Sequence, residues 1–267
     1  MNERENLTNT TFIIPLCIES EDRAINTFIT LSYLCKYLKT NIIIFEYDKE
    51  QKVDKILDKI DKGESIIIYK FIKNEGNVFH RTKLLNEMLT ITTTPVVVNY
   101  DIDIILPPEN YKLCERHIQT NNIDVAYPYF EGNSQICIDY NGRDVLLNTL
   151  DITTVDSKNT TIEKSYAGHC KFFNRQSYIE GGMENEKFIS YGPEDLELKY
   201  RFVKLGYKVF HLNARVFHIE HSRTFNSDVT NPYHTENCEL YKFLGSLSIL
   251  ELKKYYKEVD YIKKYLI

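Results

Sequence analysis

The sequence predicts an α/β fold in which a mixed, mostly parallel sheet is flanked by helices and followed by a C-terminal helical extension. Two observations carry this prediction. In residues 11–100, apolar runs of strand length alternate with segments of helical periodicity, as in parallel sheets with covering helices. From residue 236 onward, apolar residues recur only at helical spacing. We therefore expect one domain over residues 11–235 and a helical extension over residues 236–267, after a polar, disordered segment at residues 1–10.

The first half of the chain alternates predicted strands and helices. Residues 11–18 form an apolar strand, and Pro15 places it at a sheet edge or near a strand end. Ser20 is a suitable N-cap for the next helix, since Glu21 and Asp22 then stand in the first turn, where the helix dipole favours negative charge. The next predicted elements are a helix with apolar positions from 25 to 38, a strand at 41–48, a short helix at 53–60, a strand at 65–71, a helix at 79–89 and a strand at 95–100.

The second half has a less regular pattern. Residues 131–164 are polar and weakly patterned, which predicts a flexible or inserted region. Gly206 suits the C-cap of the helix before it, because glycine readily adopts the left-handed conformation found there. The remaining predicted elements are a helix at 111–120, strands at 124–130 and 171–173, a loop at 181–182, a helix at 196–205, a strand at 209–219 and helices from residue 237.

The composition is that of an ordinary globular protein, with 43% hydrophobic and 27% charged residues among 267. The net charge of −5 and the pI of about 5.9 argue against a nucleic-acid partner, which normally meets a broad basic surface. We find neither a secretory signal pattern nor an apolar run of about 18 residues, and therefore expect a cytoplasmic protein. The six cysteines form no C-x-x-C pattern and are predicted to be free, buried thiols of a reducing compartment: Cys17, Cys35, Cys114, Cys137, Cys170 and Cys238.

Asp101 and Asp103 follow the apolar strand at 95–100 and precede the aliphatic and proline residues at 104–108. In parallel α/β sheets, ligands bind beyond the carboxyl ends of the strands. Two carboxylates at such a point suit a divalent cation, which takes oxygen ligands and leaves positions open for a diphosphate. An isolated pair of this kind is more often a solvated turn, so the neighbouring motifs decide between the two interpretations.

Two further polar clusters stand at the ends of predicted elements. Glu194 and Asp195 lead into a helix, where acidic residues also occur simply because they favour the helix dipole. His218 and His221 stand near the end of a strand, and a single histidine is more often a hydrogen-bonded polar residue than a metal ligand. Together with the preceding aspartate pair, these residues place cation-binding and acid–base groups at what the pattern indicates is one edge of the sheet. A shared site is the better interpretation.

Four stretches of the chain resemble glycosyltransferases of the GT-A fold, most of all the β-1,4-galactosyltransferase type and bacterial polysaccharide glycosyltransferases. The stretch FHRTKLLN at 79–86 is similar to FNRAKLLN in that family, and DID at 101–103 is similar to its DVD segment. YGPED at 191–195 resembles WGGED, and HIEHSR at 218–223 resembles MIRHSR. Each motif alone is weak, but the shared order over most of the chain is specific. The resemblance implies a GT-A fold with a Rossmann-like sheet.

This resemblance implies a metal site and a catalytic pair. Asp103 and His221 would bind Mn²⁺ or another divalent cation, with His218 at the position of a further ligand that is methionine in the animal enzymes. Asp195 would be the general base that deprotonates the acceptor hydroxyl, and Glu194 would bind the acceptor sugar. Inverting transfer does need a carboxylate near the incoming hydroxyl, and a divalent cation can neutralise the leaving diphosphate.

The resemblance also implies a binding site for a UDP-sugar. Asp101 would contact the ribose or the metal shell, while Phe79 and Arg81 would hold the uridine diphosphate. The other residues that it assigns to the nucleotide-sugar site are Pro15 in the first strand, Glu46 facing the uracil or ribose, Tyr166 and Gly168 at the donor-sugar pocket, and Tyr191 beside the acceptor platform.

The chain departs from the family pattern in three ways. Tyr191 replaces a tryptophan and Pro193 replaces a glycine, which changes the acceptor platform. The arginine that follows the first-strand proline in the family is absent, and Cys17 stands near its position. The membrane anchor and stem of the animal enzymes are missing from this chain, which favours a bacterial or viral enzyme of the cytoplasm.

The predicted function is metal-dependent, inverting transfer of galactose, N-acetylgalactosamine or a similar sugar from a UDP-sugar to a hydroxyl of a glycan or lipid-linked glycan. Two alternatives stay open: a transferase of the same fold that acts on a protein side chain, and a non-catalytic module that binds nucleotide or glycan. The segment at 247–266 combines lysines with an apolar stripe. It could dock peripherally on the inner membrane surface, but we expect it to pack on the domain or to form a homodimer contact.

Overall fold

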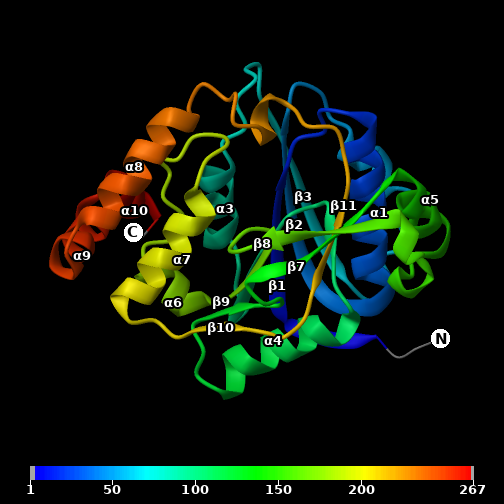
Figure 1. The fold of residues 1–267 in the computed structure, drawn as a ribbon, viewed down its shortest axis with the longest axis horizontal. Helices are drawn as coiled ribbons and strands as arrows, with labels where there is room; N and C mark the ends of the chain where they lie inside the picture. Colours follow the sequence, from blue (N-terminus) through cyan, green and yellow to red (C-terminus); the bar gives the residue numbers. More distant parts are fainter. Residues whose placement is uncertain (1–3, 266–267) are drawn as a thin grey trace.

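The computed structural model describes residues 4–265, which form two sheets and the helices around them (Figure 1). The strands are β1 (Glu5–Leu16), β2 (Leu38–Asp48), β3 (Ile66–Lys73), β4 (Val96–Tyr100), β5 (Ile104–Ile105), β6 (Val125–Tyr127), β7 (Gly132–Ile138), β8 (Thr160–Ser165), β9 (Cys170–Asn174), β10 (Val209–His211) and β11 (Val216–Ile219). The helices are α1 (Glu21–Tyr37), α2 (Val53–Leu57), α3 (Arg81–Thr90), α4 (Pro108–Thr120), α5 (Tyr140–Thr149), α6 (Arg175–Glu180), α7 (Glu194–Leu205), α8 (His234–Ser246), α9 (Ile249–Glu258) and α10 (Asp260–Tyr265), with short 3-10 turns η1 (Ile152–Thr154), η2 (Ser157–Asn159) and η3 (Phe225–Ser227).

The larger sheet has seven strands in the order β10-β6-β9-β4-β1-β2-β3. Strands β1 to β4 run parallel, whereas β9 runs antiparallel to both β4 and β6. Residues 10–16 of β1 are buried without interruption, which is typical of a parallel strand covered on both faces. The predicted α/β class, with a mixed and mostly parallel sheet, is therefore confirmed.

The first strand begins earlier than predicted. The expectation that residues 1–10 are disordered is wrong for residues 5–10, which belong to β1 and pair in part with the start of β2. Leu7 and Thr10 are buried there, and the Thr10 hydroxyl donates a hydrogen bond to Glu115 at 2.8 Å. The sequence pattern did not reveal this part of the strand, because only Leu7 and Thr10 are buried among residues 5–10 and Thr10 is polar. Residues 1–3 lie outside the described part of the chain.

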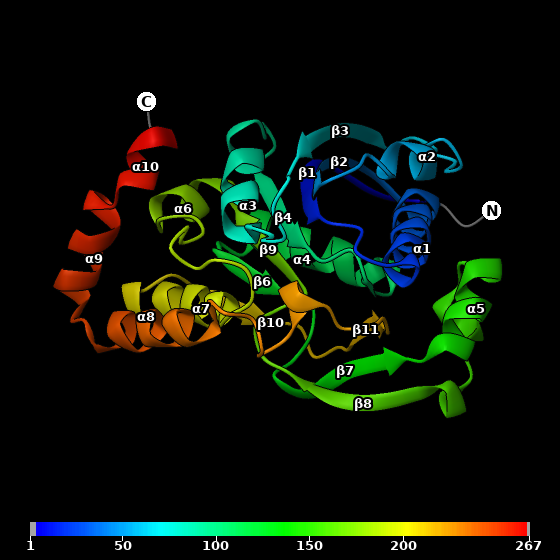
Figure 2. The ribbon, with the colours of Figure 1, turned by 90° about the horizontal axis from the view of Figure 1, so that it is seen from above.

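Residues 131–164 are not a flexible region, contrary to the prediction. They form β7, α5, β8 and two 3-10 turns, and β7 pairs antiparallel with β8. Figure 2 shows these two strands side by side, with α5 beyond the carboxyl end of β7. The pattern was weak because β8 is exposed along most of its length, whereas β7 buries Cys137 and Ile138. Together with β5 and β11 they make a second sheet, in the order β5-β11-β7-β8.

The strand predicted at 209–219 divides into two strands of different sheets. β10 pairs with β6 in the large sheet, while β11 pairs with β5 and β7 in the small one. The chain bends at Asn213 between them. β5 closely follows β4 in the chain, and β11 pairs with β5. The passage of the chain from the large sheet to the small one therefore brings His218 to the carboxyl end of the central strands.

Two helix-end predictions are confirmed. The Ser20 side chain caps α1 by accepting a hydrogen bond from the Arg23 backbone N–H at 3.2 Å. Gly206 ends α7 with a φ of 92°, in the left-handed region that glycine tolerates best. The predicted start of the third helix is two residues early, since α3 begins at Arg81 and leaves Phe79 in the preceding loop.

The C-terminal helices pack on the domain, which was the expected alternative to membrane docking. Figure 1 shows α8, α9 and α10 beside α6 and α7, and both α8 and α9 contact α7. The apolar stripe of the extension lies inward, with Leu252, Tyr256 and Ile262 buried. No helix among residues 4–265 has both the length and the apolar character that crossing a membrane requires. Leu266, at the end of the predicted stripe, is not among the described residues.

A buried ion pair lies beneath this helical contact. Nε of Arg201 is 3.0 Å from Oε1 of Glu197, both side chains are almost inaccessible, and the Tyr256 hydroxyl of α9 donates to the same carboxylate at 2.7 Å. Arg201→Ala would leave the Glu197 charge buried without its partner. We expect it to lower the free energy of unfolding by about 3–5 kcal/mol, measured by urea denaturation. Lys263→Ala, which removes an exposed pair, is the control and should leave stability nearly unchanged. Equal effects of the two variants would contradict this account.

Candidate active site

A cavity of about 270 Å³ opens at the carboxyl ends of β1 and β4. This is the edge of a parallel sheet where ligands normally bind. All three polar clusters identified in the sequence meet here, as predicted from their positions at strand ends and helix starts. The predicted site residues that line the cavity are Pro15, Phe79, Arg81, Asp101, Asp103, Gly168, Tyr191, Glu194, Asp195, His218 and His221.

Asp103, His218 and His221 bring three potential ligand atoms within 4.8 Å of one another, and all three residues are buried. Oδ2 of Asp103 lies 3.0 Å from Nε2 of His221 and 3.7 Å from a guanidinium nitrogen of Arg23. Burial alone would raise the pKa of the Asp103 carboxyl, but the His221 hydrogen bond and the neighbouring positive groups hold this pKa well below its ordinary value. An ionised carboxylate with two imidazoles is a donor set that suits divalent first-row metals.

Strand pairing explains why these three residues meet. In the antiparallel pair of β11 with β5, His218 lies opposite Ile104, the residue after Asp103. The backbone N–H of Ile219 donates to the Asp103 carbonyl at 2.7 Å, and His221 lies two residues beyond the end of β11. The hydrogen bonds of the small sheet therefore also fix the positions of these three potential ligands.

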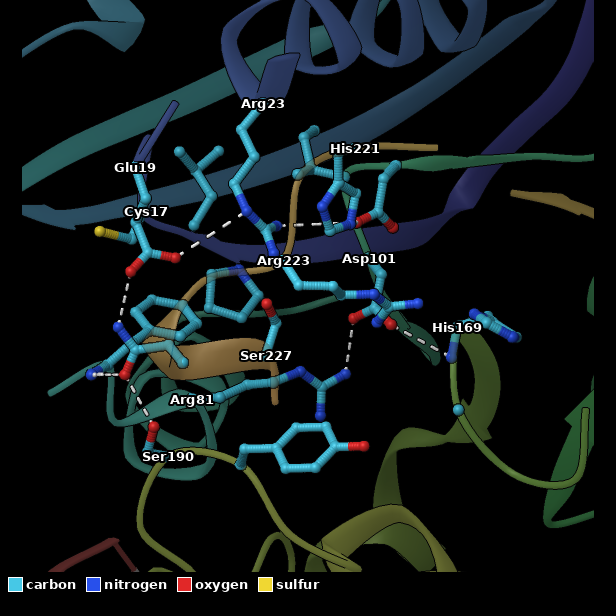
Figure 3. A pocket seen from close by; sticks show the side chains of 18 of the residues that line it. Cys17, Glu19, Arg23, Arg81, Asp101, His169, Ser190, His221, Arg223 and Ser227 are labelled. Atoms are coloured by element: carbon cyan, nitrogen blue, oxygen red, sulfur yellow. Dashed lines mark hydrogen bonds and ion pairs between the residues drawn. The ribbon is translucent and has the colours of Figure 1, made fainter. Parts of the chain in front are cut away.

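Asp101 has a different role from Asp103. Figure 3 shows its carboxylate between Arg81 and His169: it accepts from Arg81 at 2.8 Å and from the His169 backbone N–H at 3.1 Å. The Asp101 backbone N–H donates in turn to the His169 carbonyl at 2.9 Å. These contacts hold His169 at a φ of 70°, which is uncommon for a residue other than glycine. Asp101 thus positions Arg81 and the loop after Gly168, and it is not one of the three grouped ligand residues.

Glu194 and Asp195 begin α7 in opposite electrostatic surroundings. Oδ1 of Asp195 pairs with the fully buried Lys171 ammonium and with Arg81 at 3.3 Å. Burial would raise the pKa of Asp195, but Lys171 and Arg81 hold it below its ordinary value. Burial and the adjacent Asp195 charge raise the pKa of Glu194 to about 8. At neutral pH, one carboxylate is therefore ionised while its neighbour is mostly protonated, a division typical of acid–base sites.

The second oxygen of Asp195 faces the loop at Gly168. A Cβ atom added to Gly168 would lie 3.2 Å from this Oδ2 atom. Among residues 4–265, no group donates a hydrogen bond to Oδ2, whereas Oδ1 has two cationic partners. One oxygen of Asp195 is therefore bound by two cationic side chains, whereas the other has no hydrogen-bond donor among the described residues and is free to contact a ligand in the cavity.

The raised pKa of Glu194 predicts a pH dependence of stability. Between its ordinary pKa of 4.5 and about 8, the folded protein keeps a proton that the unfolded chain has lost. Folding stability therefore falls as the pH rises through this window. Glu194→Gln removes the titrating group, so its stability relative to the unchanged protein should increase from about pH 5 to about pH 8, measured by urea unfolding without ligands. A difference that is constant with pH would show that the Glu194 pKa is not raised.

Two predicted site residues lie outside the cavity. Glu46 is fully buried on β2 and accepts hydrogen bonds from the backbone N–H groups of Lys52 and Val53 and from the Tyr69 hydroxyl. It therefore holds the start of α2 and cannot face a uracil or ribose. Tyr166 is 47% exposed and does not line the cavity, so the expected contact with the donor sugar is not supported.

The sequence interpretation missed several charged residues of the site. Lys171 lies on β9 with its side chain fully buried, and its ammonium group pairs with Asp195. A lysine inside an apolar strand was a usable signal, because a buried charge requires a partner. Arg23 on α1 and Arg223 after β11 also line the cavity. Surface arginines are common, so only the fold reveals these two.

Comparisons with known proteins bear on the fold. No protein-family model matches the sequence, and no curated protein matches it either. The structure is similar to mannosyltransferase PcManGT from Pyrobaculum calidifontis in complex with GDP-Man and Mn²⁺, with a TM-score of 0.54 and 12% identity over 99% of this chain and 73% of that one. It is also similar to GalNAc-T7 with UDP, GalNAc and Mn²⁺, with a TM-score of 0.58 and 14% identity over 93% of this chain. This chain spans 54% of the GalNAc-T7 chain. At these identities the likeness shows the fold, and the predicted GT-A fold is confirmed.

Proposed function

We propose that this protein is a metal-dependent, inverting glycosyltransferase that moves galactose, N-acetylgalactosamine or a similar sugar from a UDP-sugar to a glycan hydroxyl. One observation carries the proposal. The Asp103–His218–His221 group shares a cavity with Asp195, an ionised carboxylate with one free oxygen. A module that only binds a nucleotide has no need of this second feature.

The ligand group fits a divalent cation. Its carboxylate and imidazole donors form a mixed set that accepts Mn²⁺, and both similar structures contain this ion. Asp103, His218 and His221 would hold the cation, which when bound stabilises the negative charge of the leaving diphosphate. The Nδ1 atom of His218 lies 3.1 Å from Glu220, a contact that orients the ring and leaves Nε2 for the cation.

The donor nucleotide fits along Pro15 and Phe79. A second cavity of about 460 Å³ borders the first and shares Cys17, Glu19 and Phe79 with it. The open space for a ligand therefore continues beyond the Asp103–His218–His221 group. Arg81 and Arg223 supply positive charge for the diphosphate, since guanidinium groups bind phosphate oxygens well. We propose UDP as the nucleotide, as in the GalNAc-T7 structure, although the mannosyltransferase structure holds GDP-Man.

Asp195 is the proposed general base. Lys171 and Arg81 hold its Oδ1, which leaves Oδ2 free to take the proton of the acceptor hydroxyl as that oxygen attacks the sugar. The neutral carboxyl of Glu194 would donate a hydrogen bond to the acceptor. Tyr191 stacks on His234 with 5.7 Å between ring centroids and offers an aromatic edge where the acceptor enters.

Release of UDP during sugar transfer tests this proposal. The full chain is incubated with UDP-galactose or UDP-N-acetylgalactosamine and a panel of glycan, lipid-linked and peptide acceptors. We expect a glycosylated product that requires Mn²⁺, disappears with EDTA and carries an inverted anomeric centre. A peptide product would instead support the protein-directed alternative. Nucleotide binding without any product across the panel would support the non-catalytic alternative.

A further inference from the structure

A second group of potential metal ligands also includes His218. Cys137, His218 and Glu220 each offer a donor atom, and these atoms all lie within 4.8 Å of one another. The parallel pairing of β11 with β7 places His218 directly beside Cys137. Nδ1 of His218 is 3.1 Å from Oε1 of Glu220, and the Cys137 sulfur lies within 4.8 Å of a donor atom of each side chain.

This group differs chemically from the one in the cavity. It contains a sulfur donor, whereas the Asp103–His218–His221 group contains only oxygen and nitrogen donors. Cys137 and His218 are buried, while the Glu220 side chain is 32% exposed and gives the group an opening to solvent. Thiolate, imidazole and carboxylate are the ligands that Zn²⁺ takes in proteins, often with water in the fourth position. Mn²⁺, by contrast, prefers carboxylate oxygens to thiolates.

We propose that Cys137, Glu220 and Nδ1 of His218 form a binding site for Zn²⁺, distinct from the Asp103–His221 site and in competition with it for His218. A neutral imidazole has one lone pair for a metal, and its other nitrogen carries the proton. Zn²⁺ on Nδ1 therefore moves the proton to Nε2, which can then no longer bind an ion in the cavity. The zinc site itself does not depend on the proposed function, whereas the competition rests on it.

Titration of the reduced full-length protein with Co²⁺ tests the site directly. Cobalt occupies zinc sites, and a thiolate ligand gives a near-ultraviolet charge-transfer band that oxygen and nitrogen ligands do not give. We expect one equivalent of Co²⁺ to produce this band and Zn²⁺ to remove it. Cys137→Ser should abolish the band, and Glu220→Gln should weaken Co²⁺ binding at least tenfold. Asp103→Asn, which disrupts only the cavity group, should leave the band intact.

Cys238→Ser is the matched control. Cys238 lies 3.8 Å from a ring nitrogen of His234, so it is also a thiol beside a histidine, but it belongs to neither three-residue ligand group found among residues 4–265. Its replacement should leave the band unchanged. A band that persists in Cys137→Ser, unchanged Co²⁺ affinity in Glu220→Gln, or no band in the unchanged protein would overturn the site. Thermal unfolding of each variant establishes that the loss of the band is not a loss of fold.

Electron paramagnetic resonance of Mn²⁺ in the presence of UDP tests the competition. We expect Zn²⁺ to release bound Mn²⁺ from the unchanged protein and to require at least tenfold higher concentrations in Cys137→Ser. Equal release from both proteins would overturn the competition while leaving the cobalt result standing. If Mn²⁺ never binds, the proposed function fails, and the competition with it, but the zinc site is still decided by the cobalt band.

Discussion

Asp103→Asn is expected to abolish the dependence of UDP binding on Mn²⁺ and to lower the rate of transfer at least about a hundredfold. Changes that only disturb the surroundings of a metal ligand already weaken metal binding by about 10–100-fold, and this substitution removes the single carboxylate of the group. The amide keeps the shape of the side chain but not its charge. Isothermal titration with UDP, with and without Mn²⁺, measures the effect.

Asp144→Asn serves as the control for that measurement. Asp144 lies on α5 with 69% of its side chain exposed and does not line the cavity, so the same loss of charge should leave Mn²⁺-dependent binding unchanged. Retention of Mn²⁺-dependent UDP binding in Asp103→Asn would remove this residue from the metal site. Loss of binding in both variants would point to an effect of overall charge instead.

Asp195→Asn should lower the transfer rate by about 10²–10⁴-fold, the usual contribution of a general base. UDP binding should persist, because the base acts on the acceptor rather than on the nucleotide. The change also leaves the buried Lys171 ammonium without a carboxylate partner, so thermal unfolding must first establish that the variant folds. Transfer is then measured at saturating donor, and UDP affinity by titration.

Glu194→Gln distinguishes the role of Glu194 from that of Asp195. Because the pKa of Glu194 is raised to about 8, its side chain is already mostly neutral at pH 7, and glutamine keeps a hydrogen-bond donor there. We expect this variant to raise the KM for the acceptor and to change kcat far less than Asp195→Asn does. The opposite order of effects would assign the base to Glu194.

The strand and helix pattern of residues 11–100 was predictable because the apolar periodicity there matches the elements formed. Prediction failed at residues 131–164, where β8 has almost no buried face to leave a pattern. Prediction also failed at residues 209–219, which form β10 in the large sheet and β11 in the small one. Nothing local at Asn213 specifies which strand each half of this segment will pair with. Long-range pairing, rather than local propensity, decides both cases.

The site was predictable to the extent that its residues stand at the ends of strands and helices. Asp103 and His221 could be grouped because both are expected at one edge of a single sheet. The structure does bring them within 3.0 Å, but through the antiparallel pairing of β11 with β5 in the small sheet. Glu46 also lies near the end of a strand, yet its side chain accepts hydrogen bonds from the backbone at the start of α2. Position near a strand end therefore does not determine which way a side chain faces. The roles of Asp101 and Lys171 depend on ion pairs between distant segments, which no local pattern contains.

Thermal unfolding with UDP, with and without Mn²⁺ and against GDP, tests the central claim most directly. A ligand at about a hundred times its dissociation constant stabilises a protein by roughly 2.7 kcal/mol, which is readily measured. The account predicts a rise in Tm that requires UDP and Mn²⁺ together, is smaller with GDP and is absent in Asp103→Asn. No shift with either nucleotide, or an equal shift without the metal, would contradict it.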